Sequence, residues 1–229
     1  MSIRAVSAVS LALVLLLAGC KSNDDGSSAG GDNASGSSDS SKPKYTDFKD
    51  FPGDELSYSE GGTLQPVPLR LKVVDSQWST ELGDHSAKVG SHYLVLYIAA
   101  TSGADDRGAQ HVGLNVQYTG VKFKADNPSD CEYGQGDDGC TYASSEVSDL
   151  DKKVEDNTWR DHLWIVNQYS YVDIAPKETL IGALAIEVSD KITGVSDVQF
   201  CAASPTKGTQ MYPETFPCMS LNKQPKARK

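Results

Sequence analysis

Four histidines are the side chains of this 229-residue sequence best suited to acid–base chemistry near neutral pH. His85, His92, His111 and His162 would each need a nucleophile or a metal nearby to form a hydrolytic site. The sequence has no GxSxG elbow, no HExxH motif, no GxxxxGK[ST] loop and no GxGxxG turn. All four histidines fall in expected loops or strand ends. We therefore expect no catalytic residues and no cofactor, with an enzyme lacking a recognisable motif as an alternative.

An acid-rich stretch that contains two cysteines has the composition of a cation site. It reads DNPSDCEYGQGDDGC, from Asp126 to Cys140. Carboxylates in a disulfide-closed loop are suitable oxygen ligands for Ca²⁺. The spacing does not match an EF-hand loop, in which acids alternate before a turn glycine. We therefore favour a solvated hairpin tip with no metal, and keep Ca²⁺ as the alternative.

Aromatic residues gather in the same half of the chain: Tyr133, Tyr142, Trp159, Trp164, Tyr169 and Tyr171. Most should belong to the core, but Trp159 stands in the polar run NTWRD, which predicts an exposed indole. Rigid aromatic side chains on loops supply binding area at a low entropic cost. We accordingly predict a binding surface on the segment 126–161, formed by Trp159, Arg160, Asp137, Asp138 and Tyr133.

The N-terminal segment has the layout of an export signal. One positive charge, Arg4, precedes an apolar run that ends in LAGC at Cys20. This run is shorter than the roughly 20 residues of a spanning helix. LAGC resembles the bacterial lipobox, which implies a signal peptide over 1–19 and a diacylglyceryl group on Cys20; an ordinary secretory signal is the alternative. Such an anchor would hold the protein on the outer face of the cell membrane.

Composition divides the rest of the chain into three parts. Residues 21–44 contain no large apolar side chain, which predicts a disordered linker with a reach of roughly 25 Å. The folded domain should span 45–221, and the basic tail 222–229 should be disordered. The net charge of −10 argues against a nucleic-acid partner, which requires a basic face. An envelope protein or a wall polymer is the expected partner, besides the membrane at Cys20.

Four further cysteines remain in an exported chain, and this even number predicts two disulfides. Three pairings are possible. We favour Cys131 with Cys140 and Cys201 with Cys218, because both pairs are close in sequence. A zinc site is disfavoured, because no CxxC motif occurs.

Period-two alternation predicts strands at 69–73, 111–118, 121–123, 180–188 and 198–200. The run 93–100 is apolar on both faces, which predicts a central strand. The aromatic and β-branched stretch 163–174 predicts another strand, whereas apolar spacings of three and four within 146–158 predict a short helix. Short turns separate these elements, which favours an all-β antiparallel sandwich.

Two stretches resemble a family of uncharacterised bacterial lipoprotein domains with an immunoglobulin-like sandwich, similar in fold to a secreted mycobacterial immunogen. They are LKVVDSQWSTELGDHSAKVGSHYLVLYIAAT and APKETLIGALAIEVSD. The resemblance covers about 69–200 and implies an immunoglobulin-like β-sandwich. Lys177 stands where the family has glycine, and 126–161 is an insertion. Because the family has no agreed catalytic residues, the resemblance implies none here.

These patterns together predict a lipid-anchored, extracytoplasmic, non-catalytic binding module of the bacterial envelope. A structural or protective surface lipoprotein is a second alternative, beside the enzyme without a recognisable motif.

Overall fold

The computed structural model describes residues 45, 47–60, 67–131, 139–152, 158–205 and 213–228. The predictions for the signal peptide, Cys20 and the linker lie outside these residues. Within the described part of the chain, no helix is long and apolar enough to cross a membrane.

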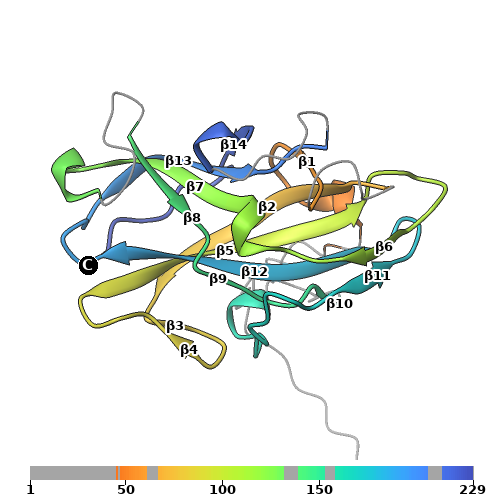
Figure 1. The fold of residues 1–229 in the computed structure, drawn as a ribbon, viewed down its shortest axis with the longest axis horizontal. Coiled ribbons are helices and arrows are strands. Elements are labelled where there is room, and N and C mark those ends of the chain that lie inside the picture. Colours follow the sequence, from red (N-terminus) through yellow and green to blue (C-terminus); the bar gives the residue numbers. More distant parts are fainter. Residues whose placement is uncertain are drawn as a thin grey trace, which may run out of the picture. The chain divides into compact units, whose positions relative to one another are not determined.

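Two antiparallel sheets form the two layers of a β-sandwich (Figure 1). The larger sheet has the order β1-β2-β5-β12-β10, with β9 also paired to β12. Its strands are β1 (Leu56–Tyr58), β2 (Leu69–Ser79), β5 (Ser91–Ser102), β9 (Glu146–Val147), β10 (Asp151–Lys152) and β12 (Thr179–Ser189). The smaller sheet has the order β14-β13-β7-β8: β7 (Thr119–Ala125), β8 (Cys140–Ala143), β13 (Val195–Ala202) and β14 (Cys218–Ser220). The predicted all-β antiparallel sandwich is confirmed.

Two further strand pairs accompany the sandwich: β3 (Glu81–Leu82) with β4 (His85–Ser86), and β6 (Ala109–Val112) with β11 (Val172–Ile174). Short 3₁₀ turns lie at η1 (Phe48–Asp50), η3 (Val116–Tyr118), η4 (Pro128–Asp130), η5 (Thr158–Arg160) and η6 (Pro213–Thr215).

The inner core fills the space between the sheets. From β5 it takes alternate residues, such as Leu96 and Ile98, and from the smaller sheet it takes Phe123 and Phe200. Leu96 lies opposite Leu184 of β12, so apolar side chains meet across the central strands. The strands predicted at 69–73, 93–100, 121–123, 180–188 and 198–200 are thereby confirmed.

The other face of the larger sheet is buried as well. Tyr97, Ile181 and Ala183 on this face pack beneath a second layer, which we call the outer cover. The outer cover consists of residues 45 and 47–51, the β3–β4 hairpin and residues 158–166. Burial on both faces explains why β5 and β12 have almost continuous apolar sequences.

A β-bulge in β2 interrupts its alternation. Val73 lies opposite Ile98 and Asp75 lies opposite Tyr97, so Val74 is the extra residue. Unbroken alternation would have directed Asp75 into the inner core with Val73. The bulge instead places the Asp75 carboxylate on the outer face, where it meets the outer cover.

Three predicted elements differ from the structure. In 146–158, β9 and β10 pair with β12 in place of a helix, with 153–157 outside the described residues. In 163–174 only β11 is a strand, because a turn at 167–170 interrupts it. In 111–118, β6 ends at Val112, and the Asn115 side chain caps η3 by accepting from the Gln117 N–H.

The tail was predicted to be disordered, but as far as residue 228 it packs against the folded domain. The Trp78 indole N–H donates to the Lys226 carbonyl at 2.8 Å, and the Arg228 guanidinium donates to the Asp190 carbonyl at 2.6 Å. These contacts hold residues 222–228 against the folded domain.

Both favoured disulfides are present in the structure. Cys201 and Cys218 lie opposite each other in β13 and β14, so their bond joins neighbouring strands of one sheet. Cys131, after η4, is bonded to Cys140 at the start of β8. The Cys201–Cys218 bond therefore differs from the inter-sheet disulfide of antibody domains.

Candidate binding site

The structure contradicts the predicted exposure of Trp159. Its side chain is only 3% exposed and packs in the outer cover near Phe51 and Tyr45, with ring centroids 6.3 and 5.9 Å away. The 3₁₀ turn η5 directs the indole inward while its polar neighbours Thr158 and Arg160 stay exposed. Trp159 therefore belongs to the core and does not form a binding surface.

Arg160 forms an ion pair with Asp75 inside the domain, so its guanidinium is already occupied. Its Nε and Nη2 donate to the two carboxylate oxygens of Asp75 at 2.6 and 2.7 Å, and the Trp159 indole N–H donates to the same carboxylate at 3.1 Å. Burial alone would raise the pKa of the Asp75 carboxyl, but these hydrogen bonds outweigh it and hold the pKa below its usual value. The cluster fastens η5 to β2.

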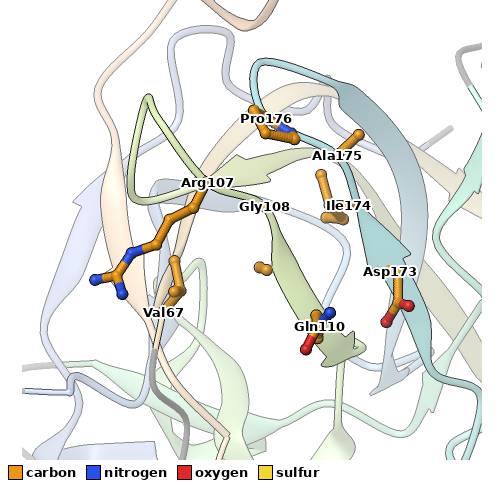
Figure 2. A pocket seen from close by; sticks show the side chains of 9 residues that line it. Val67, Arg107, Gly108, Gln110, Asp173, Ile174, Ala175 and Pro176 are labelled. Atoms are coloured by element: carbon orange, nitrogen blue, oxygen red, sulfur yellow. The ribbon is translucent and has the colours of Figure 1, made fainter.

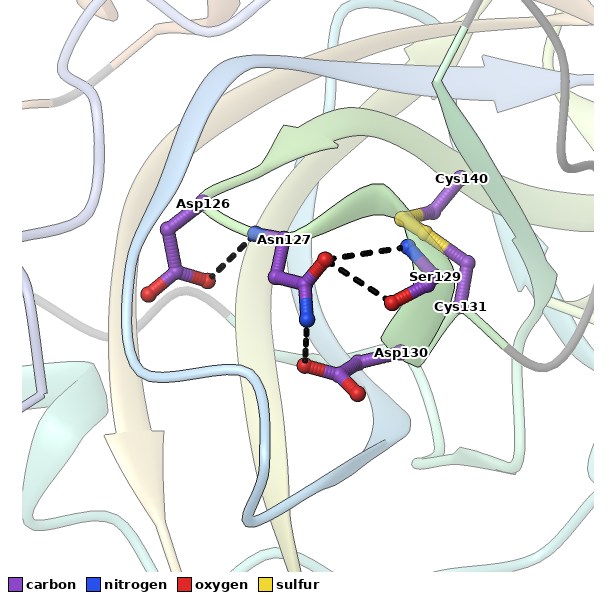
Figure 3. Close-up of a disulfide and its surroundings, with 6 residues drawn as sticks. All are labelled: Asp126, Asn127, Ser129, Asp130, Cys131 and Cys140. Atoms are coloured by element: carbon purple, nitrogen blue, oxygen red, sulfur yellow. Dashed lines mark hydrogen bonds between the residues drawn. A yellow bond between two sulfur atoms is a disulfide. The ribbon is translucent and has the colours of Figure 1, made fainter.

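The acid-rich loop is described only at its two ends (Figure 3). Asp126 accepts hydrogen bonds from the Thr193 hydroxyl and the Asn127 N–H, and the Asn127 side chain donates to Asp130 at 2.8 Å. These bonds stabilise the turn before Cys131. Tyr133, Asp137 and Asp138 lie outside the described residues, and no metal-binding cluster is found among those that are described.

A cleft of about 520 Å³ lies over the β6–β11 pair, and neither Trp159 nor Arg160 lines it (Figure 2). Buried Val67, Ala109 and Ile174 lie at its base, and the exposed Ala175 and Pro176 also line it. The strands approach closely here: a Cβ on Gly108 would lie 2.2 Å from the Ile174 carbonyl oxygen. Glycine at this position therefore permits the backbone contact beside the cleft.

Three polar side chains surround the cleft. Arg107 lies on one side of β6 and Asp173 on the other, with Gln110 between them (Figure 2). The Arg107 guanidinium is exposed and makes no ion pair with any residue that the structure describes. One Asp173 oxygen accepts from the His111 N–H at 2.8 Å. An apolar cleft with a few polar groups at its rim is typical of small-ligand sites.

Backbone irregularity explains why the sequence concealed this cleft. The β6–β11 register shifts between Val172 and Ile174, and His111 adopts a left-handed conformation with φ of 53°. Asp173 is held by the His111 N–H, which an unbroken ladder would direct to a backbone carbonyl. The strands predicted at 111–118 and 163–174 overlap β6 and β11 only in part. The regular alternation assumed for them gave no sign of the register shift at Val172–Ile174. The one sequence feature that could have indicated the cleft is the RGA motif, in which Arg107 precedes the small residues Gly108 and Ala109.

The histidines have ordinary structural partners. His85 contacts Glu146 at 3.0 Å, and His162 contacts Asp151 at 2.7 Å. His92 contacts Asp190, and the His111 ring stacks on Tyr171 with centroids 4.2 Å apart. These pairs join different segments of the fold, such as β4 and β9 in the case of His85 and Glu146.

No protein family and no curated protein matches the chain. Among solved structures, the chain is similar to an uncharacterised β-sandwich protein from Clostridium difficile 630. The two share 14% sequence identity with a TM-score of 0.36, over 69% of this chain and 86% of the other.

Proposed function

We propose that the protein is a lipid-anchored binding module of the bacterial envelope, with the β6–β11 cleft as its ligand site. The anchor is Cys20, by its resemblance to the lipobox. Two disulfides support an oxidising, extracytoplasmic location. In this role the protein binds its ligand without catalysis.

The β6–β11 cleft is the observation on which the ligand site rests. Both faces of the larger sheet are covered, one by the smaller sheet and one by the outer cover. A ligand that binds beside the larger sheet must therefore do so at an edge or between loops. The cleft joins apolar area to Arg107, a cation with no acidic partner among the described residues of a protein whose net charge is −10.

The polar groups favour a peptide carboxyl terminus as the ligand. A guanidinium forms two parallel hydrogen bonds to a carboxylate, which suits Arg107. Asp173 on the opposite side is an acceptor and suits a peptide N–H. The exposed side chains of Ala175 and Pro176 then contact an aliphatic or aromatic side chain of the terminal residue.

Titration calorimetry with N-acetylated tripeptides that end in valine tests this proposal. We expect the free carboxylate to bind at least about tenfold more tightly than the C-terminal amide, because a charged hydrogen bond is lost. Arg107→Ala should abolish this preference, whereas Lys191→Ala removes an exposed positive charge outside the cleft and should not. Equal affinity for acid and amide, or an unaffected Arg107→Ala protein, would contradict the ligand assignment.

A further inference from the structure

Large apolar side chains are exposed mainly in one segment of the described chain. Leu163 is 82% exposed and Ile165 is 65% exposed, and Tyr169 and Tyr171 follow in the same segment. The remaining exposed example, Val89, lies between β4 and β5. Single exposed apolar residues are ordinary, but two that share one side of a segment form an apolar surface.

The backbone presents Leu163 and Ile165 in a fixed orientation. Trp164 between them is buried, so its two neighbours face solvent. The Asp149 N–H donates to the Ile165 carbonyl at 3.0 Å, and the Trp164 indole N–H donates to the Trp159 carbonyl at 2.9 Å. The side chains of Leu163 and Ile165, which we call the apolar patch, therefore project from a fixed segment of the outer cover.

The chain that leads to Cys20 enters the domain in the same layer. Tyr45 stacks on Phe51 with ring centroids 4.7 Å apart, and its ring lies 5.9 Å from that of Trp159. The Trp159 carbonyl in turn accepts a hydrogen bond from the indole of Trp164, the buried residue between Leu163 and Ile165. The start of the folded domain and the apolar patch thus belong to one side of the larger sheet.

We infer that the apolar patch contacts the bilayer surface to which the protein is anchored. This inference rests on the proposed anchor at Cys20, and a disordered linker over 21–44, as the sequence predicts, would have a reach of roughly 25 Å and permit the contact. Two aliphatic side chains gain free energy by leaving water for the acyl-chain boundary. The net charge of −10 gives little attraction to anionic headgroups, so apolar contact with neutral lipid is the favoured mode.

Tryptophan quenching by brominated lipid tests this contact. The acylated full-length protein is reconstituted into phosphatidylcholine vesicles with brominated acyl chains. Trp159 and Trp164 lie in the outer cover, so insertion of the patch should bring them near the bromine atoms and quench their emission. Leu163→Ser/Ile165→Ser should lose most of this quenching while it still floats with the vesicles. Val89→Ser, which removes a fully exposed aliphatic side chain elsewhere, should be quenched like the unmodified protein.

The outcomes separate this inference from the anchor. A protein that floats but is not quenched, or a double variant quenched as strongly as the unmodified protein, overturns the inference and leaves the anchor intact. A protein that does not float overturns both. Sedimentation identifies a second copy as the occupant: if the double variant is smaller and quenching is absent, the patch joins two copies and the bilayer contact is wrong.

Discussion

Trp159 joins parts of the outer face through its indole N–H and its backbone carbonyl. Its indole N–H donates to Asp75, and its carbonyl accepts from Trp164. We predict that Trp159→Ala lowers the free energy of unfolding by about 3–5 kcal/mol, because a buried indole is lost. Urea unfolding measures this. Trp159→Phe keeps a ring and should cost clearly less; a Trp159→Ala protein as stable as Trp159→Phe would contradict the core assignment.

Asp75 should give the protein part of its acid sensitivity. Burial raises the pKa of its carboxyl, but the hydrogen bonds from Arg160 and Trp159 lower this pKa by more than burial raises it. The folded pKa therefore lies below the unfolded value of about 3.9. Ionised Asp75 therefore stabilises the fold above about pH 4, and this contribution disappears as the pH falls through the folded pKa.

Asp75→Asn should lower the free energy of unfolding at neutral pH by about 1–2 kcal/mol, since Arg160 is 42% exposed and solvent weakens its ion pair. Between neutral pH and about pH 3, the variant should lose less stability than the unmodified protein. Urea unfolding at several pH values measures both effects. Arg160→Gln should flatten the same acid limb; parallel curves for all three proteins would show that this ion pair does not contribute.

The binding residues were predicted less well than the fold, and Trp159 shows why. Its flanking residues are polar and exposed, which correctly indicates a surface segment. The direction of one side chain within a 3₁₀ turn depends on φ and ψ and on the layer beneath it, and neither is encoded in the polarity of the neighbours. Arg107 was missed for a related reason, because its cleft exists only where two distant segments pair.

At the scale of elements, long alternating or continuous apolar runs were predicted correctly. β2, β5 and β12 each bury at least one face over many residues, so the periodicity is clear. β9 and β10 are only two residues long, and their apolar spacing imitated a helix. Tertiary pairing with β12 decided their structure, and that pairing is not visible in a local window.

The β3–β4 hairpin depends on a close approach at Gly83. A Cβ at this position would lie 2.3 Å from the Trp164 carbonyl oxygen, and the φ of Gly83 is +60°. Gly90 has a φ of +86° but nothing within 4 Å of its Cβ position, so it is a matched control for backbone strain alone. Gly83→Ala therefore adds a backbone clash to this strain.

We predict that Gly90→Ala costs about 1 kcal/mol and Gly83→Ala about 1–3 kcal/mol more. Thermal unfolding of both variants measures the difference. Tyr97 packs near Trp164 beneath the hairpin, so near-ultraviolet circular dichroism should also change in Gly83→Ala alone. Equal losses in the two variants would mean that the outer cover shifts freely to admit the methyl group.

At the scale of the whole molecule, the described ends of the chain are both packed against the sandwich. Lys72 donates to the Phe51 carbonyl at 2.9 Å and lies over the Phe48 ring, which holds the start of the domain on β2. The C-terminal segment packs against β2 and β13. Composition alone predicted a disordered tail, because its lysines and arginines show no apolar pattern. The tail is instead held by hydrogen bonds to its backbone, such as that from Trp78 to the Lys226 carbonyl, and by the side chain of Gln224.

Removal of residues 222–229 should therefore destabilise the domain. The segment supplies the Lys226 carbonyl to the Trp78 indole, two hydrogen bonds between Gln224 and the Val198 backbone, and the bonds from Arg228 to Thr193 and Asp190. At about 0.5–1.5 kcal/mol for each of these five hydrogen bonds, truncation after Leu221 should lower the free energy of unfolding by roughly 3–7 kcal/mol. Arg228→Ala alone should cost less, because it keeps the Gln224 and Lys226 contacts. Urea unfolding followed by tryptophan emission measures both, and loss of the Lys226 contact should shift the Trp78 contribution to longer wavelength. A truncated protein with the same unfolding midpoint and emission spectrum would show that the tail contributes nothing to the stability of the sandwich.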